Sequence, residues 1–344
     1  MAYNPAGMTL RGTGAQAGVT MVALNSKVKG YVSNNTTGKV GKLEDHPLVP
    51  HFFAQYKLND RTRIGAGAYT PYAFATNYSK NWYGRSHAIR SEITAIDYEL
   101  AASYDLTKHF SLGAAIIAET VEAELTNAVD AVAPYGTSKS KVEGRSYTTV
   151  YDLGIIYKLG EDTRFGLSYH SQAVHQIRGS HHVTSEIPLL GMGTEAFSHA
   201  GTKLTLPEYY TLSAYHKIND FGLSASVKWT RWSKFKTLDI WSSTNPYRTK
   251  SSTGAIDEDW KDTWMFSLGS DYYYNDKWTF RAGVSYDQAG VTSSKHRTAR
   301  VPDSDRWILG VGASYKINDK MQIDAGYSHV FMKASERSEE RRVG

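Results

Sequence analysis

The sequence predicts an all-β protein, a transmembrane antiparallel β-barrel, on three observations. Many short segments alternate apolar residues with small or polar ones, the period-two pattern of strands that have two different faces. A short turn phrase recurs along the chain. Aromatic residues are abundant, with 24 Tyr, 8 Trp and 11 Phe among 344 residues, beside 29 Gly. Barrel strands expose apolar groups only at every second position, so such a protein need not be hydrophobic on average.

Composition excludes several other classes. The absence of Cys excludes disulfides, thiolate metal ligands and cysteine nucleophiles. The mean hydropathy is −0.45, and no apolar run approaches the roughly twenty residues of a membrane-spanning helix. The net charge of +5, from 39 Lys+Arg against 34 Asp+Glu, forms no basic stripe, so we expect no nucleic-acid partner. The N-terminus lacks a secretory signal, which fits either a cytoplasmic protein or a mature or truncated form.

The recurring turn phrase places the tight ends of hairpins. It combines an aromatic or His residue with Lys, Asn, Asp or Gly, and the last three tolerate the backbone geometry of tight turns. Copies lie roughly 40 to 60 residues apart, which suits hairpins joined by long loops at their other ends. The six copies are Tyr56–Asp60, Tyr104–Lys108, Tyr157–Glu161, His216–Asp220, Tyr274–Lys277 and Tyr315–Asp319.

These turns join twelve predicted strands, and a thirteenth precedes the first long loop. An odd number is unusual for a bacterial single-chain barrel, because an open edge in lipid leaves backbone groups unpaired. We therefore expect a fourteenth strand beyond the C-terminus in the complete protein. The predicted strands are 16–28, 50–57 with 62–70, 93–104 with 109–119, 147–157 with 163–171, 207–216 with 221–231, 262–273 with 278–287, and 305–315 with 320–331.

Aromatic residues also mark both ends of the predicted strands, as in the two interfacial girdles of membrane barrels. The alternative is a soluble β-sandwich, whose connections would mostly be short. In this sequence long connections fall opposite the short turns, the outer-membrane pattern of short periplasmic turns and long outer loops. The girdle residues are Tyr104, Tyr157, Tyr274 and Tyr315 beside the turns, and Trp229, Trp264 and Tyr286 at the opposite ends.

Several segments, in order along nearly the whole chain, resemble the FadL-like family of outer-membrane long-chain fatty acid and hydrocarbon transporters. The resemblance implies a fourteen-stranded barrel in the bacterial outer membrane, plugged by an N-terminal hatch. The segments are Asn4-Pro5-Ala6-Gly7-Met8, 52–56, 65–76, Trp82-Tyr83-Gly84-Arg85 and 123–129.

The resemblance divides the chain into three parts. Residues 1–15 correspond to a remnant of the hatch, in which Asn4, Pro5 and Ala6 form the junction or gate. Residues 16–333 form the barrel. The charged tail 334–344 is either a final loop or non-native sequence. In the family the Asn-Pro-Ala segment follows a signal peptide and further hatch residues, so we expect this hatch to be truncated.

Two predicted outer loops contain apolar residues in segments that should face water. In loop 121–146, a helical face would carry Leu125, Ala128, Val129 and Val132. Loop 172–206 contains the apolar residues Ile187, Leu189, Leu190 and Met192. Exposed apolar patches often mark contact sites. The loops either pack on each other as a lid or, as the resemblance implies, form a groove that captures the ligand.

A strand break and two arginines complete the predicted ligand path. Pro71, with Tyr72 and Phe74, ends or kinks the third strand, because proline cannot donate to a ladder. The resemblance implies an inward kink that opens a lateral hole, whereas the simpler alternative is an ordinary strand end. Arg85 and Arg90 are candidate ligands for a fatty acid carboxylate, or else solvated loop residues.

The remaining polar residues give little reason to expect a metal or cofactor. His170, His175, His181 and His182 fit no common ligand spacing, so no metal site is predicted. Lys228 and Arg281 lie on the small-residue faces of strands and are expected to line a wet lumen.

We predict a monomeric outer-membrane barrel that contacts lipid and lipopolysaccharide and moves hydrophobic molecules, above all long-chain fatty acids. The expected route is capture at the outer loops, passage past the hatch and lateral exit at the kink. Alternatives are an aromatic-hydrocarbon channel, a general diffusion porin, or a membrane enzyme. The chain lacks a Gly-x-Ser-x-Gly nucleophile elbow, and we expect no catalysis.

Overall fold

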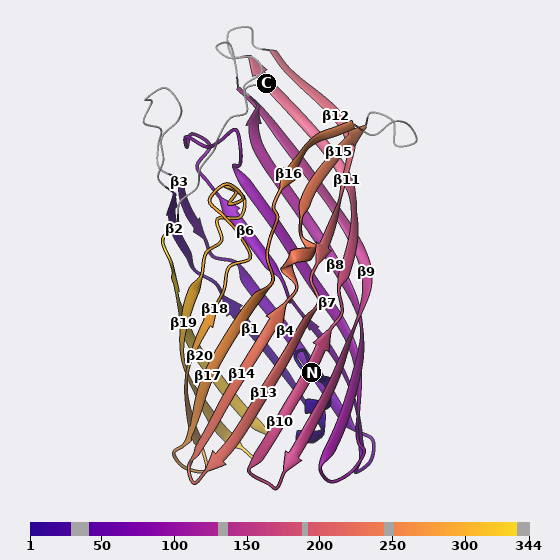
Figure 1. Ribbon diagram of the computed structural model, residues 1–344, viewed down its shortest axis with the longest axis vertical. Helices are drawn as coiled ribbons and strands as arrows, with labels where there is room; N and C mark the ends of the chain where they lie inside the picture. Colours follow the sequence, from indigo (N-terminus) through magenta and orange to yellow (C-terminus); the bar gives the residue numbers. More distant parts are fainter. Residues whose placement is uncertain (29–40, 130–136, 188–191, 244–250, 336–344) are drawn as a thin grey trace.

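The computed structural model describes residues 1–28, 41–129, 137–187, 192–243 and 251–335. Strands dominate it, as predicted: an 18-stranded sheet curves around a lumen, and a separate two-stranded sheet lies beside it (Figure 1). Short turns gather at one end of the molecule, and the longer hairpins rise at the other (Figure 1). None of the helices in the described residues is long and apolar enough to cross a membrane.

Thirteen strands form the main wall, in the number and chain order that were predicted. Taken in chain order, each of them pairs antiparallel with the next. They are β1 (Gly14–Met21), β4 (Leu48–Lys57), β5 (Thr62–Tyr69), β7 (Arg90–Asp105), β8 (Phe110–Val129), β9 (Thr137–Leu159), β10 (Thr163–His170), β13 (Tyr209–Ile218), β14 (Phe221–Thr230), β17 (Thr263–Tyr273), β18 (Trp278–Asp287), β19 (Arg306–Asn318) and β20 (Met321–Met332).

Alternation along each strand separates a lumen face from an outer face. On β7, Asp97 and Glu99 are buried, whereas Tyr98 and Leu100 are 53% and 64% exposed. Large apolar side chains exposed at every second position suit lipid on the outside of a barrel. The buried polar side chains therefore face the lumen.

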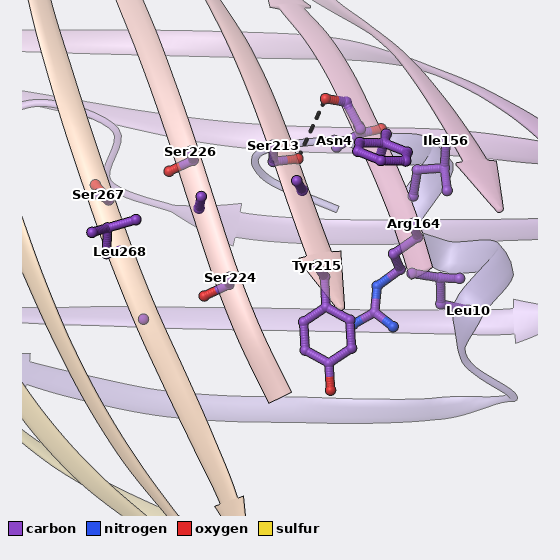
Figure 2. Close-up of a pocket in the computed structure, with 15 residues that line it drawn as sticks. Asn4, Leu10, Ile156, Arg164, Ser213, Tyr215, Ser224, Ser226, Ser267 and Leu268 are labelled. Carbon is purple, nitrogen blue, oxygen red and sulfur yellow. Dashed lines mark hydrogen bonds between the residues drawn. The ribbon is translucent and has the colours of Figure 1, made fainter. Parts of the chain in front are cut away.

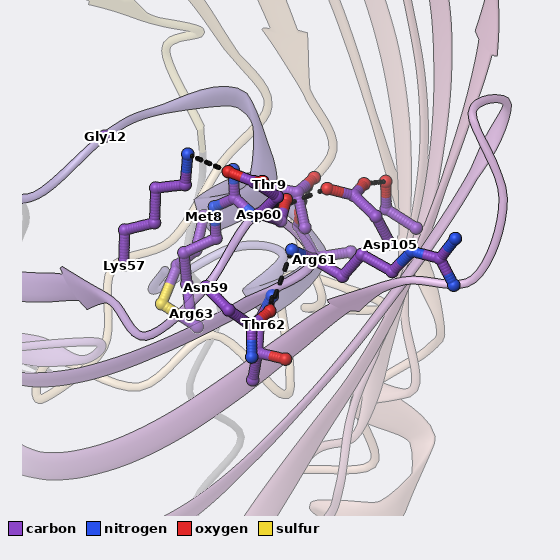
Figure 3. Close-up of polar contacts among 12 residues, drawn as sticks. Met8, Thr9, Gly12, Lys57, Asn59, Asp60, Arg61, Thr62, Arg63 and Asp105 are labelled. Atoms are coloured by element: carbon purple, nitrogen blue, oxygen red, sulfur yellow. Dashed lines mark hydrogen bonds and ion pairs between the residues drawn. The ribbon is translucent and has the colours of Figure 1, made fainter.

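Side-chain caps explain why the recurring phrase makes tight turns. In the β17–β18 turn, the Asn275 Oδ1 atom accepts hydrogen bonds from the backbone N–H groups of Lys277 and Trp278, at 2.9 and 2.8 Å. Asn59 caps Arg61 and Thr62 in the same way in the β4–β5 turn, shown in Figure 3. Asn side chains favour turns because they bond their own backbone.

We expect Asn275→Ala to lower the free energy of unfolding by about 1 kcal/mol, because two turn N–H groups lose their acceptor. Urea unfolding of the protein refolded in detergent measures this change. Asp276→Ala is the control, since the Asp276 side chain makes no hydrogen bond within the described ranges. Equal stability of the two variants would contradict the capping role.

The sheet continues beyond the predicted strands at the upper end. The predicted loop 172–206 is wrong: it is a hairpin of β11 (Ala173–Ile187) and β12 (Met192–Leu206), with β11 paired to β9 and β12 to β15 (Thr237–Ser243). Beside it, β15 pairs with β16 (Ser251–Asp257). These strands are mostly polar, and their apolar alternation is limited to short stretches such as Leu204 with Leu206 and Leu238 with Ile240.

The N-terminal part also differs from prediction. The single strand 16–28 is wrong, because β1 ends at Met21 and β2 (Leu24–Val28) pairs with β3 (Gly41–Asp45) in the separate sheet. The Val22 N–H donates to the Pro47 carbonyl at 3.1 Å where the chain leaves β1. Two 3-10 helices, η1 (Pro5–Leu10) and η3 (Trp232–Lys234), and the short strand β6 (Ala73–Asn77) complete the described elements.

The predicted helical face of loop 121–146 is also wrong up to Val129, where the described residues pause. Strand β8 runs unbroken to Val129, pairing with β7 up to Thr126 and with β9 up to Val129. Val121, Ala123 and Leu125 also follow period two, and two flanking ladders satisfy the backbone groups that a helix would have to pair internally. The fourteenth strand and the nature of tail 334–344 stay predictions.

Candidate functional site: the barrel lumen

The N-terminal segment lies inside the lower half of the barrel, against the wall (Figure 1). The Asn4 Nδ2 atom donates to the carbonyls of Ile155 on β9 and Leu167 on β10, at 3.3 and 3.2 Å. The Asn4 Oδ1 atom accepts from the Ala6 N–H at 3.0 Å and so caps η1. Pro5 follows at the start of η1, where a missing N–H costs nothing. The predicted junction residues Asn4, Pro5 and Ala6 therefore tether the segment to two wall strands.

Glycines in the wall make room for this tether. Gly113 on β8 lies directly opposite Gly154 on β9. A Cβ atom on Gly113 would overlap the backbone of Pro5 and Ala6, and one on Gly154 would overlap the Asn4 side chain. The segment therefore packs on a surface that only glycine can form.

The other side of η1 is held by β4 and by apolar packing. The Gln55 Nε2 atom donates to the Met8 and Gly12 carbonyls, at 3.2 and 2.7 Å. Met8 is buried against Ala101 and Ala115 of the wall. Figure 3 shows Met8 and Thr9 beside the β4–β5 turn, where Arg63 bonds the Asp60 carbonyl at 2.8 Å. η1 is thus fixed on both flanks.

The third wall strand is broken where a kink was predicted. Tyr69 of β5 lies opposite Asp97, and Ala73 of β6 lies opposite Thr94. From Tyr69 to Ala73 the broken strand advances by four residues, whereas β7 advances by three between Asp97 and Thr94. The extra residue lies beside Pro71. Insertions of this kind bend a strand locally. Across the break, the Ala95 N–H donates to the Tyr72 carbonyl at 2.8 Å.

The break coincides with an interruption of the wall. The β4–β5 ladder ends at the pair Phe52 and Ala68. Beyond that pair, residues 48–51 of β4 pair only with β1, whereas β6 pairs with β7. Between 48–51 and 73–77, all of them described residues, the structure contains no ladder. Backbone groups along this line are therefore not sealed by strand pairing.

Apolar side chains line the lumen from the outer end down to this break. The outer cluster contains Leu125 of β8 with Leu238 and Ile240 of β15. The inner cluster contains Ala95, Ile117, Val121, Val150, Ala173, Ile177, Leu204 and Leu206. Phe235, just after η3, packs against both clusters, and Tyr72 packs against the inner one. The two clusters therefore form one apolar track that reaches the break.

Aromatic rings border this track. Tyr72 meets Trp232 edge-on, with centroids 6.1 Å apart, and its hydroxyl donates to the Pro207 carbonyl at 3.3 Å. The ring centroid of Trp260 lies 4.9 Å from that of Trp232 and 5.1 Å from that of Phe235. Rings in such tilted pairs stabilise each other beyond simple burial. The turn of chain at 232–235 thus presents an aromatic face to the track.

The predicted carboxylate-binding arginines are not equivalent. Arg90 lies at the outer end of β7 and forms ion pairs with Glu92 and, at 3.8 Å, with Glu124. The Arg85 carbonyl accepts from the Ala128 N–H at 2.8 Å, which ties the 78–89 segment to β8. A ligand carboxylate at Arg90 would have to compete with two protein carboxylates.

Sequence reasoning missed Arg300, in the connection between β18 and β19. Its guanidinium donates to the Ser91 Oγ at 3.0 Å and to the Asn127 Oδ1 at 3.4 Å. Burial lowers the pKa of Arg300 to about 10, and nearby Glu258 opposes that shift. Burial likewise raises the pKa of Glu258 to about 7. No local pattern marks Arg300, because its partners lie far away in the sequence.

A cavity of about 400 Å³ lies beside the tethered N-terminus (Figure 2). Its lining combines polar and apolar side chains, and the Arg164 guanidinium stacks over the Tyr215 ring, 3.7 Å from the ring centroid. Lys228 and Arg281 also stand among lumen groups, Lys228 over the Tyr209 ring and Arg281 paired with Asp271. The polar residues of the cavity that Figure 2 labels are Asn4, Arg164, Ser213, Tyr215, Ser224, Ser226 and Ser267.

The four histidines singled out from the sequence lie on β10 and β11 and form separate pairs. His170 bonds Asp152, His175 bonds Glu119, His181 bonds Ser140 and His182 bonds Ser180. Across the part of the chain that the structure describes, no three His, Asp or Glu side chains are arranged to hold a metal ion.

The structure describes most of the other predicted ligand and kink residues. Leu125 lies in the outer cluster and Val129 at the end of β8, half-buried. Ile187 and Met192 oppose each other at the ends of β11 and β12. Phe74 lies on β6, half-buried. Val132, Leu189 and Leu190 lie outside the described residues.

Comparison with known proteins identifies the family. Residues 1–343 match the family model described as outer membrane protein transport protein (OMPP1/FadL/TodX). A 47 kDa outer membrane protein of Pasteurella multocida is 29% identical over 312 residues, 83% of this chain and 68% of that protein. A long-chain fatty acid transport protein of Escherichia coli is 26% identical over 295 residues, covering 75% and 63%. The matches thus span about two thirds of these relatives' lengths.

Solved structures agree in fold. A Pseudomonas aeruginosa FadL homologue superposes with a TM-score of 0.78 at 24% identity, covering 96% of this chain and 84% of that one. The toluene transporter TodX of P. putida gives 0.75 at 18% identity, covering 94% and 85%. The family match confirms the resemblance found in the sequence and the predicted outer-membrane location, and this chain belongs to the FadL/TodX family of outer-membrane transport proteins.

Proposed function

We propose that this chain moves hydrophobic molecules, above all long-chain fatty acids, from the outer apolar cluster to the strand break. Its family consists of transporters and channels rather than enzymes. The proposed route has three parts: capture at the outer end near Leu125, passage along the lumen above the tethered N-terminal segment, and lateral exit at Pro71. Arg85 and Arg90, at the outer rim, are the proposed first contacts for a carboxylate.

One observation carries this proposal: the apolar track is continuous. Phe235 contacts both clusters, and Tyr72 joins the inner cluster to the broken strand. A membrane pore for ions would be lined by polar groups, because ions need water or polar ligands throughout. An apolar lining that ends at an unpaired stretch of wall suits a ligand that leaves into lipid.

Aromatic hydrocarbons are the second candidate class. The observation that favours them is the group of rings around the track, Tyr72, Trp232, Phe235 and Trp260. Offset and edge-on contacts would hold a flat guest as well as they hold each other. For either ligand we expect a monomer whose outer face contacts membrane lipid and lipopolysaccharide.

We expect Leu125→Asp to weaken binding of a fluorescent long-chain fatty acid by at least about tenfold, because a carboxylate would replace a buried apolar group. Fluorescence titration of the purified protein in a non-ionic detergent measures the affinity. Leu125→Met conserves volume and is the control. Wild-type affinity in the aspartate variant would remove the outer cluster from the route.

A further inference from the structure

Buried ionisable groups lie among the side chains of the inner apolar cluster. On β8, Glu119 stands between Ile117 and Val121, and on β11, His175 stands between Ala173 and Ile177. All four flanking residues belong to the cluster. Side chains two apart on a strand share a face, so Glu119 and His175 face the apolar track. Their side chains meet at 2.7 Å, between Oε1 and Nε2.

Three more carboxylates lie beside or inward of this pair. Asp97 of β7 is directly opposite Glu119 in the ladder. Glu99 follows Asp97 two residues later on the same face. Asp152 of β9 bonds His170 of β10 at 2.6 Å. We call Asp97, Glu99, Glu119 and Asp152 the acidic layer.

The acidic layer is buried and incompletely paired. Its four side chains belong to residues no more than 3% exposed. Within the described residues, both carboxylate oxygens of Asp97, both of Glu99 and the Nδ1 atom of His175 have no hydrogen-bond partner. Buried polar groups are nearly always paired, and each exception needs an explanation. The orphan Nδ1 atom of His175 belongs to a side chain that is 0% exposed within the apolar cluster.

Few positive groups face this layer. Tyr69 faces it from β5, Tyr72 from the break and Tyr209 from β13. In the described chain the facing cations are His170 and His175, when protonated, and the Met1 amino group, which acts on Glu99 and Asp152. Lys228 stands behind the Tyr209 ring, 5.1 Å from its centroid. Four carboxylates thus outnumber the histidines that contact them.

We propose that the acidic layer selects ligands by charge at the strand break: uncharged hydrophobic molecules are admitted to the inner cluster beside the break, and anionic head groups are not. The proposal rests on the proposed function, because it concerns the same route. An anion in the inner cluster would leave water for a buried site that holds carboxyl groups and few cations, in a medium that screens poorly. A neutral hydroxyl, by contrast, could donate to the free oxygens of Asp97 or Glu99. A fatty acid would pass this point as the protonated acid.

The test uses two ligands of equal chain length, 1-tetradecanol and tetradecyl sulfonate, the second always anionic. The full chain in non-ionic detergent is equilibrated with each ligand, and bound ligand is quantified by mass spectrometry. We expect the wild-type protein to bind the alcohol at least about tenfold more tightly than the sulfonate. In Asp97→Asn/Glu99→Gln the preference should fall to about twofold. Glu122→Gln, an exposed carboxylate of β8, is the matched control and should keep the wild-type ratio.

The outcomes separate the two proposals. Equal binding of alcohol and sulfonate by the wild-type protein would overturn charge selection, as would an unchanged ratio in the double variant. The single variant Glu99→Gln, which shifts the ratio part of the way if the proposal holds, serves if the double variant does not fold. Failure of the wild-type protein to bind the alcohol would overturn the proposed function itself, and charge selection with it.

Discussion

Replacing Gly113 and Gly154 by alanine is expected to release the N-terminal segment from the barrel wall. Each new methyl group would overlap Asn4, Pro5 or Ala6, and the backbone on the other side cannot move aside cheaply. Overpacking of this kind costs about 1 to 3 kcal/mol per site. That cost acts directly on the contacts of Asn4 with the Ile155 and Leu167 carbonyls.

Hydrogen exchange of the peptide covering residues 1–13 measures the release. We expect its amides to exchange at least about tenfold faster in the double variant, since about 1.4 kcal/mol corresponds to a factor of ten. Gly326→Ala is the control, because a Cβ atom there would make only ordinary contact with the Val311 carbonyl. Unchanged exchange in the double variant would show that the glycines do not seat the segment.

Sealing the broken strand is expected to stop most ligand uptake. Pro71→Val restores an N–H group, and deleting Thr70 as well makes the broken strand equal in length to the β7 segment it faces. Each restored ladder hydrogen bond stabilises the sealed wall by about 1 kcal/mol. The sealed state should therefore be populated about tenfold or more over the open state. Uptake of a fluorescent fatty acid by cells that make each variant measures the effect.

The control for this experiment is Pro302→Val, in the connection between β18 and β19. It removes a proline without touching the third strand, so uptake should stay at the wild-type level. If the variant that combines Pro71→Val with the deletion of Thr70 folds and transports normally, lateral exit at the break is wrong.

The wall strands were predictable because lipid imposes a strong pattern. Outer positions must be apolar and lumen positions small or polar, so period two is visible in strands such as β14 and β19. The same requirement vanishes above the membrane. Strands β11, β12, β15 and β16 carry mostly polar residues there, and alternations as short as Leu204 with Leu206 or Leu238 with Ile240 are too brief to distinguish a strand from a loop.

The apolar track was partly predictable. Leu125 was predicted as a ligand residue from a helical spacing that is wrong, and the structure places it in the outer apolar cluster on a period-two strand. Pro71 was recognised correctly as a point where a ladder fails. The sequence did not predict that Phe235 joins the two apolar clusters, because that contact depends on where η3 lies in the lumen.

The acidic layer was within reach of the sequence. Asp97 and Glu99 alternate with Tyr98 and Leu100, which places them in the lumen. The turn at 105–109 fixes the register, so that Asp105 faces Ser111 and, eight steps up each strand, Asp97 faces Glu119. What the sequence could not supply is burial, because contacts with His175 and the inner cluster come from strands whose extent was not predicted.

Photo-crosslinking tests the central claim most directly, that a hydrophobic ligand travels from the outer cluster to the strand break. A neutral alkyl probe carrying a diazirine is bound by the purified protein and activated, and the labelled peptides are mapped by mass spectrometry. The account predicts labels at Leu125, Phe235 and Tyr72, with the label at Tyr72 lost in Leu125→Asp. Labels confined to the cavity of Figure 2, or to the outer lipid-facing side chains, would contradict it.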